Sequence, residues 1–517
     1  MKFIQTLTLL LFVACCGRAG TFSTLFDFSA DPIGQGPFSQ LVQGPNGTLY
    51  GETFDARADT SWGTIFAINP NGTGFTNLFT FNYTNGAFPE GGLILSGNTL
   101  YGTTYEGANG YGTVFAVGTN GLNFTNLFSF TNGIDGESPV TSLLLSGNTL
   151  YGTAEGGGLN GYGTIYAINT DSTGFTNIYQ FTSANGGNPG SSLILSGSTL
   201  YGTGGGGAFG DGSVFAVNTN GSGFTNLVSF DNYNGYAPVS SLILSGNTLY
   251  GTTEQGGAHG DGEVFAVHTD STGFTNLYSF GKTTGDGDSP EAGLVLSGNT
   301  LYGTTYGGGT KNFGNVFAIN TDSLGFTNLY SFTDGADGAD IATGLILSGH
   351  TLYGTANRGG TNNDGTIFSL TFTPPASPPS QPSLSIHVTG GNLVITWSNT
   401  VTGYALVSAT NLGSSASWSI VTNTPVIVNG FYTVTVATTG GQKYYSLARP
   451  ALSIHASGGN LVITWPDTVS GFTLMSSTTL GSSASWSTVT NTPGIVNGLY
   501  TVTVAITGGQ MFYSLSP

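Results

Sequence analysis

The string Leu100-Tyr101-Gly102 occurs seven times in the chain with nearly constant spacing. Its copies begin at Leu49, Leu100, Leu150, Leu200, Leu249, Leu301 and Leu352, so successive copies are 51, 50, 50, 49, 52 and 51 residues apart. A fixed period of this size is typical of a propeller, a solenoid or another array of repeated units. The repeats cover about two thirds of the chain. The whole chain has 517 residues, and this length predicts several domains.

Each copy of the string lies within a unit of four short runs that are typical of β-strands, named A to D in chain order. Around Tyr101 these runs are residues 93–96, 99–104, 112–117 and 124–130. Gly97-Asn98, between A and B, is a strong two-residue hairpin turn because both residues tolerate positive φ. Run A is apolar at consecutive positions, which indicates a strand covered on both faces. We therefore expect β-strands in units of four that pack face to face.

The repeats begin and end at unequal points of the unit. The run at residues 22–28 is a lone copy of D, and the last unit stops after its run C at 366–369. The first run can therefore complete the last unit and close a ring of seven, which leaves no unpaired strand edge. A linear solenoid would more naturally carry capping repeats. We predict an all-β fold, with a seven-bladed β-propeller over residues 22–372 closed by its N-terminal strand.

The strings Leu-Tyr-Gly-Thr-Thr, Gly-Thr-Val-Phe-Ala and Gly-Phe-Thr-Asn-Leu-Tyr-Ser-Phe carry a family resemblance. They occur, for example, at 301–305, 112–116 and 273–280. Residues 22–372 resemble the GloVer tandem-repeat family of secreted bacterial proteins. The resemblance implies a repeat-built extracellular protein with no assigned catalytic residues.

A second kind of repeat follows the first. Residues 373–382 are rich in proline and predict an extended, fairly stiff linker. Two similar segments, 383–449 and 450–517, follow at a step of 68 residues, and each has about six short strands separated by turn residues. This pattern indicates two small β-sandwich modules. The strand that ends in Trp397, repeated at Trp465, resembles that of fibronectin type III modules, and both rings are expected to anchor a core.

The composition limits the classes of partner. Charged residues make up only 7% of the chain, against about a quarter in an ordinary soluble protein. Acids outnumber bases by 26 to 8, which gives a formal net charge of −18. We expect no nucleic-acid partner, because no basic patch exists to neutralise phosphates. An acidic, neutral-polar surface suits cations, glycans or simple solubility.

Residues 1–19 have the pattern of a secretion signal. A basic start, an apolar stretch at 3–14 and small residues up to Ala19 predict a cut after that residue. The mature protein is then expected outside the cell or on its surface, with no transmembrane span. The alternatives are an uncut N-terminal anchor and lipid attachment at Cys15, which follows a degenerate lipobox.

In a propeller the loops from D to the next A share one face with the loops from B to C. Both kinds of loop are rich in Asp, Asn and Gly in this chain, and loops on a rigid scaffold usually carry function. Five aspartates offer the oxygen ligands that calcium prefers: Asp286, Asp288, Asp334, Asp337 and Asp340. Their spacing is not that of a known calcium loop, and Asp-Gly is also a good turn former, so turn formation is the competing interpretation. No cofactor other than calcium is expected.

The B–C loop around His259, Asp261 and Glu263 is a second candidate. Glu263 stands where other units have Thr, Ser or Asn, as at Thr113 and Asn315. One imidazole and two carboxylates can bind a metal or a ligand, or act as acid and base. The competing interpretation is that the sequence of this unit has drifted from the repeat in a loop exposed to solvent.

Two functions fit these features. The first is a non-catalytic binding or structural protein that presents a polar, acidic loop face to an extracellular glycan or protein. The second is a polysaccharide-active hydrolase or lyase on a propeller, which needs two carboxylates about 5–10 Å apart. The first is favoured because every unit is built alike and no unit carries a convincing catalytic set.

Overall fold

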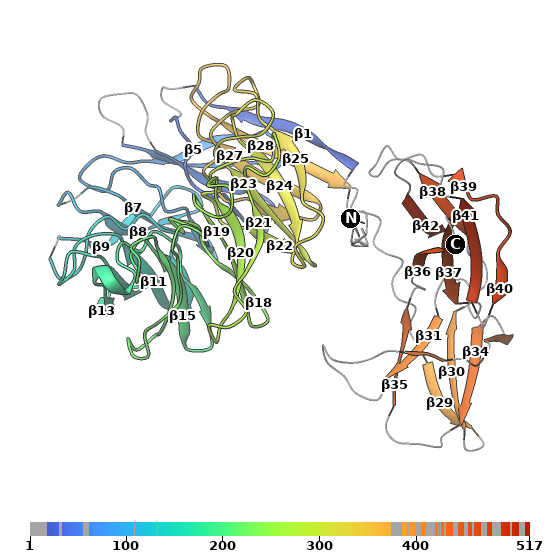
Figure 1. The fold of residues 1–517 in the computed structure, drawn as a ribbon. Coiled ribbons are helices and arrows are strands. Elements are labelled where there is room, and N and C mark those ends of the chain that lie inside the picture. The colour runs from blue at the N-terminus through green and yellow to red at the C-terminus, as the bar shows by residue number, and fades with distance from the viewer. Residues whose placement is uncertain are drawn as a thin grey trace, which may run out of the picture. The chain divides into compact units, whose positions relative to one another are not determined.

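Each Leu-Tyr-Gly string lies in the second strand of a four-stranded antiparallel sheet in the computed structural model of the chain (Figure 1). The chain divides into two compact units, Met1–Thr373 and Pro374–Pro517. In the first unit the structure describes residues 18–29, 34–54, 62–107, 109–131 and 133–373. In the second it describes the strands between Ser385 and Ser516 with short flanking stretches.

Seven four-stranded sheets make up the described part of the first unit. In chain order they are β2 (Val42–Gln43), β3 (Leu49–Thr53), β4 (Thr64–Ile68) and β5 (Thr76–Thr80); β6 (Ile94–Ser96), β7 (Thr99–Thr104), β8 (Thr113–Gly118) and β9 (Thr125–Ser129); β10 (Leu144–Ser146), β11 (Thr149–Ala154), β12 (Thr164–Asn169) and β13 (Thr176–Gln180); β14 (Ile194–Ser196), β15 (Thr199–Gly204), β16 (Ser213–Asn218) and β17 (Thr225–Ser229); β18 (Ile243–Ser245), β19 (Thr248–Thr253), β20 (Glu263–His268) and β21 (Thr275–Ser279); β22 (Val295–Ser297), β23 (Thr300–Thr305), β24 (Asn315–Asn320) and β25 (Thr327–Ser331); and β26 (Ile346–Ser348), β27 (Thr351–Ala356) and β28 (Thr366–Thr373) with β1 (Arg18–Asp27). A short 3-10 helix, η1 (Ser183–Asn185), lies in the loop after β13. The prediction of an all-β fold in units of four strands is confirmed.

The glycine of the Leu-Tyr-Gly string makes room for an aromatic ring on the neighbouring strand. Gly102 in β7 pairs with Phe115 in β8, and a Cβ atom at Gly102 would lie 2.6 Å from the Phe115 ring. The same contact recurs in the other six sheets, with Tyr166 in place of phenylalanine in one of them. Glycine is therefore required at this position by close packing rather than by a turn.

The N-terminal strand β1 completes the last sheet. It pairs antiparallel with β28, so that Phe22 lies opposite Leu370. The lone run predicted at 22–28 thus does pair with the last unit, although β1 begins earlier, at Arg18. Residues 1–17, which include Cys15 and most of the expected signal peptide, lie outside the described residues, and the cut after Ala19 stays a prediction.

Hydrophobic clusters show that the sheets form a closed ring. Seven clusters in the described residues each draw side chains from two successive sheets. One of them joins Leu49 and Phe66 of the first sheet to Tyr353 and Ile367 of the last. In Figure 1 the sheets follow one another from blue through green to yellow. This arrangement is that of a β-propeller.

A belt of stacked aromatic rings links the outer strands. An aromatic residue of one outer strand stacks on an aromatic residue of the next, with ring centroids 3.6–4.2 Å apart. The pairs are Phe26–Phe75, Phe79–Phe124, Phe128–Phe175, Tyr179–Phe224, Tyr278–Phe326 and Tyr330–Phe22. At the remaining junction Val228 stands where the other outer strands have an aromatic residue. Phe274 packs against the hydrophobic cluster that contains Val228. Two of the six pairs include a residue of β1, so this strand contacts the sheet on either side of its own.

A ring of hydroxyl hydrogen bonds also crosses the junctions between sheets. In six of the seven sheets, the threonine that follows the Leu-Tyr-Gly string donates its hydroxyl to a backbone carbonyl of the next unit, over 3.1–3.5 Å. The bond from Thr355 to the Ser39 carbonyl, at 3.2 Å, closes the ring. The exception is Glu52 in β3, whose Oε2 instead accepts a hydrogen bond from the Gly92 N–H at 3.1 Å.

The second unit contains two copies of a pair of sheets. The first copy has the sheet β29 (Ser385–Thr389), β30 (Asn392–Ser398), β34 (Phe431–Ala437) and β33 (Val426–Val428), and the sheet β32 (Ser419–Ile420), β31 (Ala405–Ala409) and β35 (Tyr444–Ala448). The second copy has β36 (Ser453–Ser457), β37 (Asn460–Pro466), β41 (Leu499–Ala505) and β40 (Gly494–Val496), and then β39 (Ser487–Thr488), β38 (Thr473–Ser477) and β42 (Phe512–Ser516).

In the first copy the two sheets share one core. Trp397 and Val434 of one sheet pack with Leu406 of the other, and Trp397 is only 2% exposed. The prediction that Trp397 anchors a core is confirmed. The likeness to fibronectin type III modules stays a prediction. The predicted linker at 373–382 lies outside the described residues except for Thr373, which ends β28. No helix in the described part of the chain is long and apolar enough to cross a membrane.

Candidate functional site

The D–A and B–C loops lie at the same end of each antiparallel sheet, and we call this end of the propeller the loop face. Among the described residues, isolated β-bridges join the two kinds of loop in five of the sheets, as between Ala87 and Glu106 or between Asp288 and Gly307. The loops therefore carry backbone hydrogen bonds beyond the ends of the strands. Such bonds hold the loop side chains in fixed positions.

Three of the five predicted calcium ligands, Asp286, Asp337 and Asp340, are buried, and the first two accept hydrogen bonds within turns. Asp286 accepts hydrogen bonds from the Tyr278 hydroxyl at 2.7 Å and from the Thr283 N–H at 3.0 Å. Asp337 accepts one from the Tyr330 hydroxyl at 3.0 Å. Burial and the adjacent carboxylate raise the pKa of both tyrosine hydroxyls, which therefore stay protonated as donors. A calcium ion bound here would share these carboxylate oxygens with their hydrogen-bond donors.

Asp288, Asp334 and Asp340 do not gather with these two. Asp340 forms an ion pair with Arg358 at 3.2 Å. Asp334 is exposed at a backbone φ of 59°, and Asp288 lies in the bridge to Gly307. The described residues contain no group of three or more His, Cys, Asp or Glu side chains placed to hold a metal ion. The hydrogen bonds of Asp286 and Asp337 are those of turn residues, and calcium binding by the five aspartates stays a prediction.

The three residues His259, Asp261 and Glu263 differ in burial. His259 and Asp261 are exposed in the B–C loop, and the Asp261 charge adds to the burial that raises the pKa of Asp288. Glu263 is instead fully buried at the start of β20, and neither of its carboxylate oxygens has a hydrogen-bond partner. Burial raises the pKa of Glu263 to about 7. Glu263 is thus a core residue, not part of the exposed loop face.

Three glutamates of the loop face have raised pKa values. Burial, together with the charge of Glu155, raises the pKa of Glu90 to about 7. Burial, together with the charges of Glu254 and nearby aspartates, raises the pKa of Glu291 to about 7. Burial also raises the pKa of Glu155. Near neutral pH this face therefore carries protonated as well as ionised carboxyl groups.

Exposed apolar side chains gather on the loop face. Of the eleven large apolar side chains exposed in the described part of the first unit, nine lie in its D–A or B–C loops. They are Tyr83, Tyr105, Ile134, Leu159, Tyr162, Phe209, Tyr233, Tyr236 and Val239. The other two, Leu122 and Leu324, lie in C–D loops at the opposite end. Tyr233 is 88% exposed and Phe209 66%, so these rings contact little of the protein.

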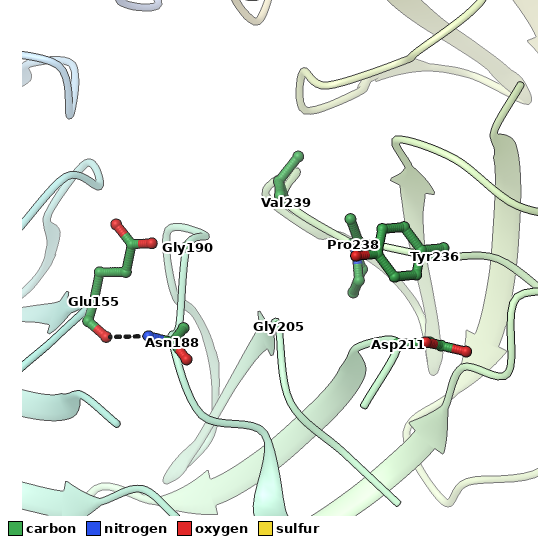
Figure 2. Close-up of a pocket in the computed structure, with 9 residues that line it drawn as sticks. Glu155, Asn188, Gly190, Gly205, Asp211, Tyr236, Pro238 and Val239 are labelled. Atoms are coloured by element: carbon green, nitrogen blue, oxygen red, sulfur yellow. Dashed lines mark hydrogen bonds between the residues drawn. The ribbon is translucent and has the colours of Figure 1, made fainter. Parts of the chain in front are cut away.

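A hollow of about 170 Å³ opens on the loop face where the sheet β14–β17 meets its neighbours. It is lined by Glu155, Asn188, Gly190, Gly205, Asp211, Tyr236, Ala237, Pro238 and Val239. Figure 2 shows Glu155 and Asn188 on one side, Asp211 and Tyr236 on the other, and Gly205 between them. Asn188 Nδ2 donates a hydrogen bond to the Glu155 carbonyl oxygen at 3.2 Å, which ties together the two loops that form one wall.

Several of these residues carry little or no signal in the sequence. Glu52 had a visible signal, because it interrupts a column of threonines when the units are aligned on Leu-Tyr-Gly. Glu90 and Glu291 each follow a proline in a D–A loop, and this position in the sequence does not indicate that their side chains are buried. The hollow had no signal stronger than two glycines among 85.

Four-stranded sheets in a closed ring, with the variable loops at one end, define a β-propeller repeat protein. The chain belongs to the Gloeobacter/Verrucomicrobia repeat family, whose repeat matches residues 15–208 and 203–377. This match confirms the family resemblance of the repeats. No curated protein matches the chain in sequence.

Solved structures with a similar fold share little sequence with the chain. An oligogalacturonate lyase from Vibrio parahaemolyticus is 10% identical, with a TM-score of 0.44 over 69% of this chain and 98% of that one. An oligogalacturonate lyase in complex with manganese is 11% identical, with a TM-score of 0.42 over 69% and 98%. TolB from Acinetobacter baumannii is 10% identical, with a TM-score of 0.35 over 64% and 78%. Likeness at this level says nothing of activity.

Proposed function

We propose that the protein is a non-catalytic glycan-binding protein of the cell exterior and that it binds its ligand on the loop face of the propeller. The observation that carries the proposal is the gathering of exposed apolar side chains, most of them aromatic, in the loops of that face. Exposed rings of this kind are costly to hydrate and mark a surface that contacts a ligand.

The chemistry of the face favours a glycan over the other partners. Aromatic rings offer a flat apolar surface to the C–H face of a sugar, and carboxylates and amides hydrogen-bond its hydroxyl groups. With 8 basic residues against 26 acids, the chain has little to attract phosphate or other polyanions. The secretion signal expected at residues 1–19 would place the loop face among extracellular polysaccharides.

Removal of two exposed rings tests the proposal. The double variant Phe209→Ser, Tyr233→Ser is expected to weaken glycan binding at least about tenfold, because each ring contributes on the order of 1 kcal/mol to a stacking contact. A glycan array identifies the ligand, and titration calorimetry measures the affinity. The unfolding temperature should hardly change, because both rings are mostly exposed.

The matched control changes exposed leucines at the opposite end of the propeller. The variant Leu122→Ser, Leu324→Ser removes exposed apolar area without touching the loop face and should bind as the wild type does. Equal affinity in all three proteins, or the absence of any glycan ligand, would count against the proposal.

A specific observation also favours a second candidate function, a polysaccharide hydrolase. Glu90 and Glu155 lie close enough for the charge of one to raise the pKa of the other, and the pKa of Glu90 is about 7. A protonated and an ionised carboxyl group facing one substrate can act as general acid and base.

We expect no cleavage of any polysaccharide that the protein binds, as measured by the release of reducing ends at pH 5–8. The variant Glu90→Gln provides the decisive comparison. Release of reducing ends by the wild type that is lost in Glu90→Gln, with binding retained, would establish a polysaccharide-cleaving enzyme and overturn the non-catalytic proposal.

A further inference from the structure

We propose that the hollow at sheet β14–β17 is the subsite at which the loop face holds a single uncharged sugar ring. This inference rests on the proposed glycan-binding function and adds the place and the chemical class of the sugar. Four lines of observation support it: the origin of the hollow, the freedom of its glycines, the chemistry of its walls and the surface around it.

The hollow exists because two glycines replace side chains that the other units carry. Gly205 directly follows strand β15, and the equivalent residues of the other units are Phe54, Tyr105, Glu155, Glu254, Tyr306 and Asn357. Gly190 follows the loop proline Pro189, and its equivalents are Phe38, Glu90, Val140, Val239, Glu291 and Ala342. Only this unit lacks a side chain at both positions. The space on the loop face is therefore local to one sheet of the ring.

Neither glycine is required by the backbone. Neither has a positive φ. A Cβ atom at Gly190 would meet nothing within 4 Å, and one at Gly205 would meet nothing nearer than 3.6 Å. Nearby glycines differ: a Cβ at Gly207 would lie 2.8 Å from a backbone oxygen, at a φ of 143°. Folding would thus permit larger residues at Gly190 and Gly205, and their absence leaves room for a ligand.

The walls of the hollow match a neutral sugar. Glu155 and Asp211 offer carboxylate oxygens that accept hydrogen bonds from hydroxyl groups. Tyr236, Pro238 and Val239 offer apolar surface to the C–H face of a sugar ring. No Lys or Arg is among the lining residues, so a uronic acid would bring a third negative charge without a partner. A bare cation would gain nothing from the apolar wall.

The size of the hollow limits the ligand to one ring. Its volume is about 170 Å³, whereas pockets for drug-sized molecules have about 300–1,000 Å³. The rest of a longer glycan would lie on the surface around the hollow. Six of the nine exposed apolar side chains of the loop face come from the loops that line it. They are Leu159, Tyr162, Phe209, Tyr233, Tyr236 and Val239.

Filling the hollow with a residue native to the repeat tests the inference. Gly205→Tyr introduces the side chain that equivalent units carry at Tyr105 and Tyr306, so the fold should tolerate it. We expect Gly205→Tyr to weaken binding of the strongest uncharged oligosaccharide on a glycan array at least about tenfold in titration calorimetry. Gly205→Ala should change the affinity less than about twofold, because a methyl group leaves most of the space open.

A matched control adds bulk at the same repeat position of another unit. Ala342→Val lies at the position of Gly190 in the last sheet, remote from the hollow in the ring, and should leave the affinity unchanged. The array carries neutral, amino and uronic oligosaccharides, and a folding check by circular dichroism accompanies each variant.

The outcomes separate this inference from the proposed function. Binding that survives Gly205→Tyr but is lost in Phe209→Ser, Tyr233→Ser would overturn the subsite and leave the glycan-binding face standing. A preference for uronic or amino sugars over neutral ones would overturn the assigned class of sugar. Failure of the wild type to bind any glycan would overturn both.

Discussion

Removal of β1 is expected to abolish cooperative folding of the propeller. A deletion of residues 18–28 takes away the fourth strand of the last sheet and leaves β28 with an unpaired edge. It also removes Phe28, which is fully buried in the cluster that joins the last sheet to the first. The ring then opens at the junction that closes it.

The expected size of the effect follows from the contacts that are lost. Truncation of one buried phenylalanine costs about 3–5 kcal/mol. The stacked pairs Phe26–Phe75 and Tyr330–Phe22 add on the order of 1 kcal/mol each, and seven backbone pairings with β28 are lost as well. Native domains are stable by only about 5–15 kcal/mol in total. The deletion should therefore remove most of the stability, seen in calorimetry as loss of the unfolding transition.

Three further variants distinguish ring closure from mere loss of mass. Moving residues 18–29 to a position after Thr373, through an Asn-Gly turn, restores β1 beside β28 as a local hairpin and should restore the transition. Phe28→Ala and Phe230→Ala remove equivalent, fully buried rings from the closing sheet and from an interior sheet. Each should lower the free energy of unfolding by about 3–5 kcal/mol. A deletion variant that melts as the wild type does would contradict the closed ring.

The propeller is expected to lose stability as the pH rises from about 5 to 8, and Glu52 is expected to be a major cause. Glu52 is buried in β3, and its Oε1 has no hydrogen-bond partner. Burial, opposed in part by the hydrogen bond from the Gly92 N–H, raises the pKa of Glu52 from 4.5 to about 8. The folded protein therefore holds this proton at pH values where the unfolded chain has released it.

The direction of the pH effect follows from proton linkage. Between pH 4.5 and 8 the native state binds more protons at Glu52 than the unfolded state does, so the free energy of unfolding falls as the pH rises. The contribution of the protonated group is fully present below pH 4.5 and is lost by about pH 8. Its size between pH 5 and 8 is on the order of 3 kcal/mol, at about 1.4 kcal/mol per pH unit.

Glu52→Gln measures this contribution directly, because the amide keeps the size of the side chain and an acceptor for the Gly92 N–H. Urea titrations should give nearly equal stabilities for variant and wild type at pH 5, and a variant more stable by about 3 kcal/mol at pH 8. Glu263→Thr, the residue of equivalent units, should flatten the profile further, because burial also raises the pKa of Glu263. The exposed Asp322→Asn changes net charge equally and should leave the slope as it was. Parallel profiles for all four proteins would sink the assignment.

The sequence predicted the architecture well because the architecture is repeated. The Leu-Tyr-Gly string and the runs around it state the same local preference seven times over, so that errors at one unit are corrected by the others. The pairing of β1 with β28 followed from counting strands, which needs no knowledge of side-chain contacts.

The candidate site could be predicted only in part, because it depends on departures from the repeat. Asp286 and Asp337 have the chemistry of calcium ligands, and in the structure each also accepts a hydrogen bond from a tyrosine hydroxyl. Calcium binding at these residues stays a prediction. Glu263 had the chemistry of a loop carboxylate, but it is the first residue of β20, as Thr113 is of β8, and its side chain is fully buried. In each case the surroundings of the carboxylate depend on how the loop and the strand fold, which the residue types do not state.

By itself the sequence determined the strands, their order and the family, because these follow from periodic patterns that every unit repeats. It also indicated the closure of the ring, because the first run completes the last unit. Only the tertiary structure decided which acids are buried, where exposed rings gather and that Gly190 and Gly205 leave a hollow. The physical reason is that the burial of a side chain, or the space beside it, depends on all the residues that surround it. The residues around the hollow come from three successive sheets of the ring.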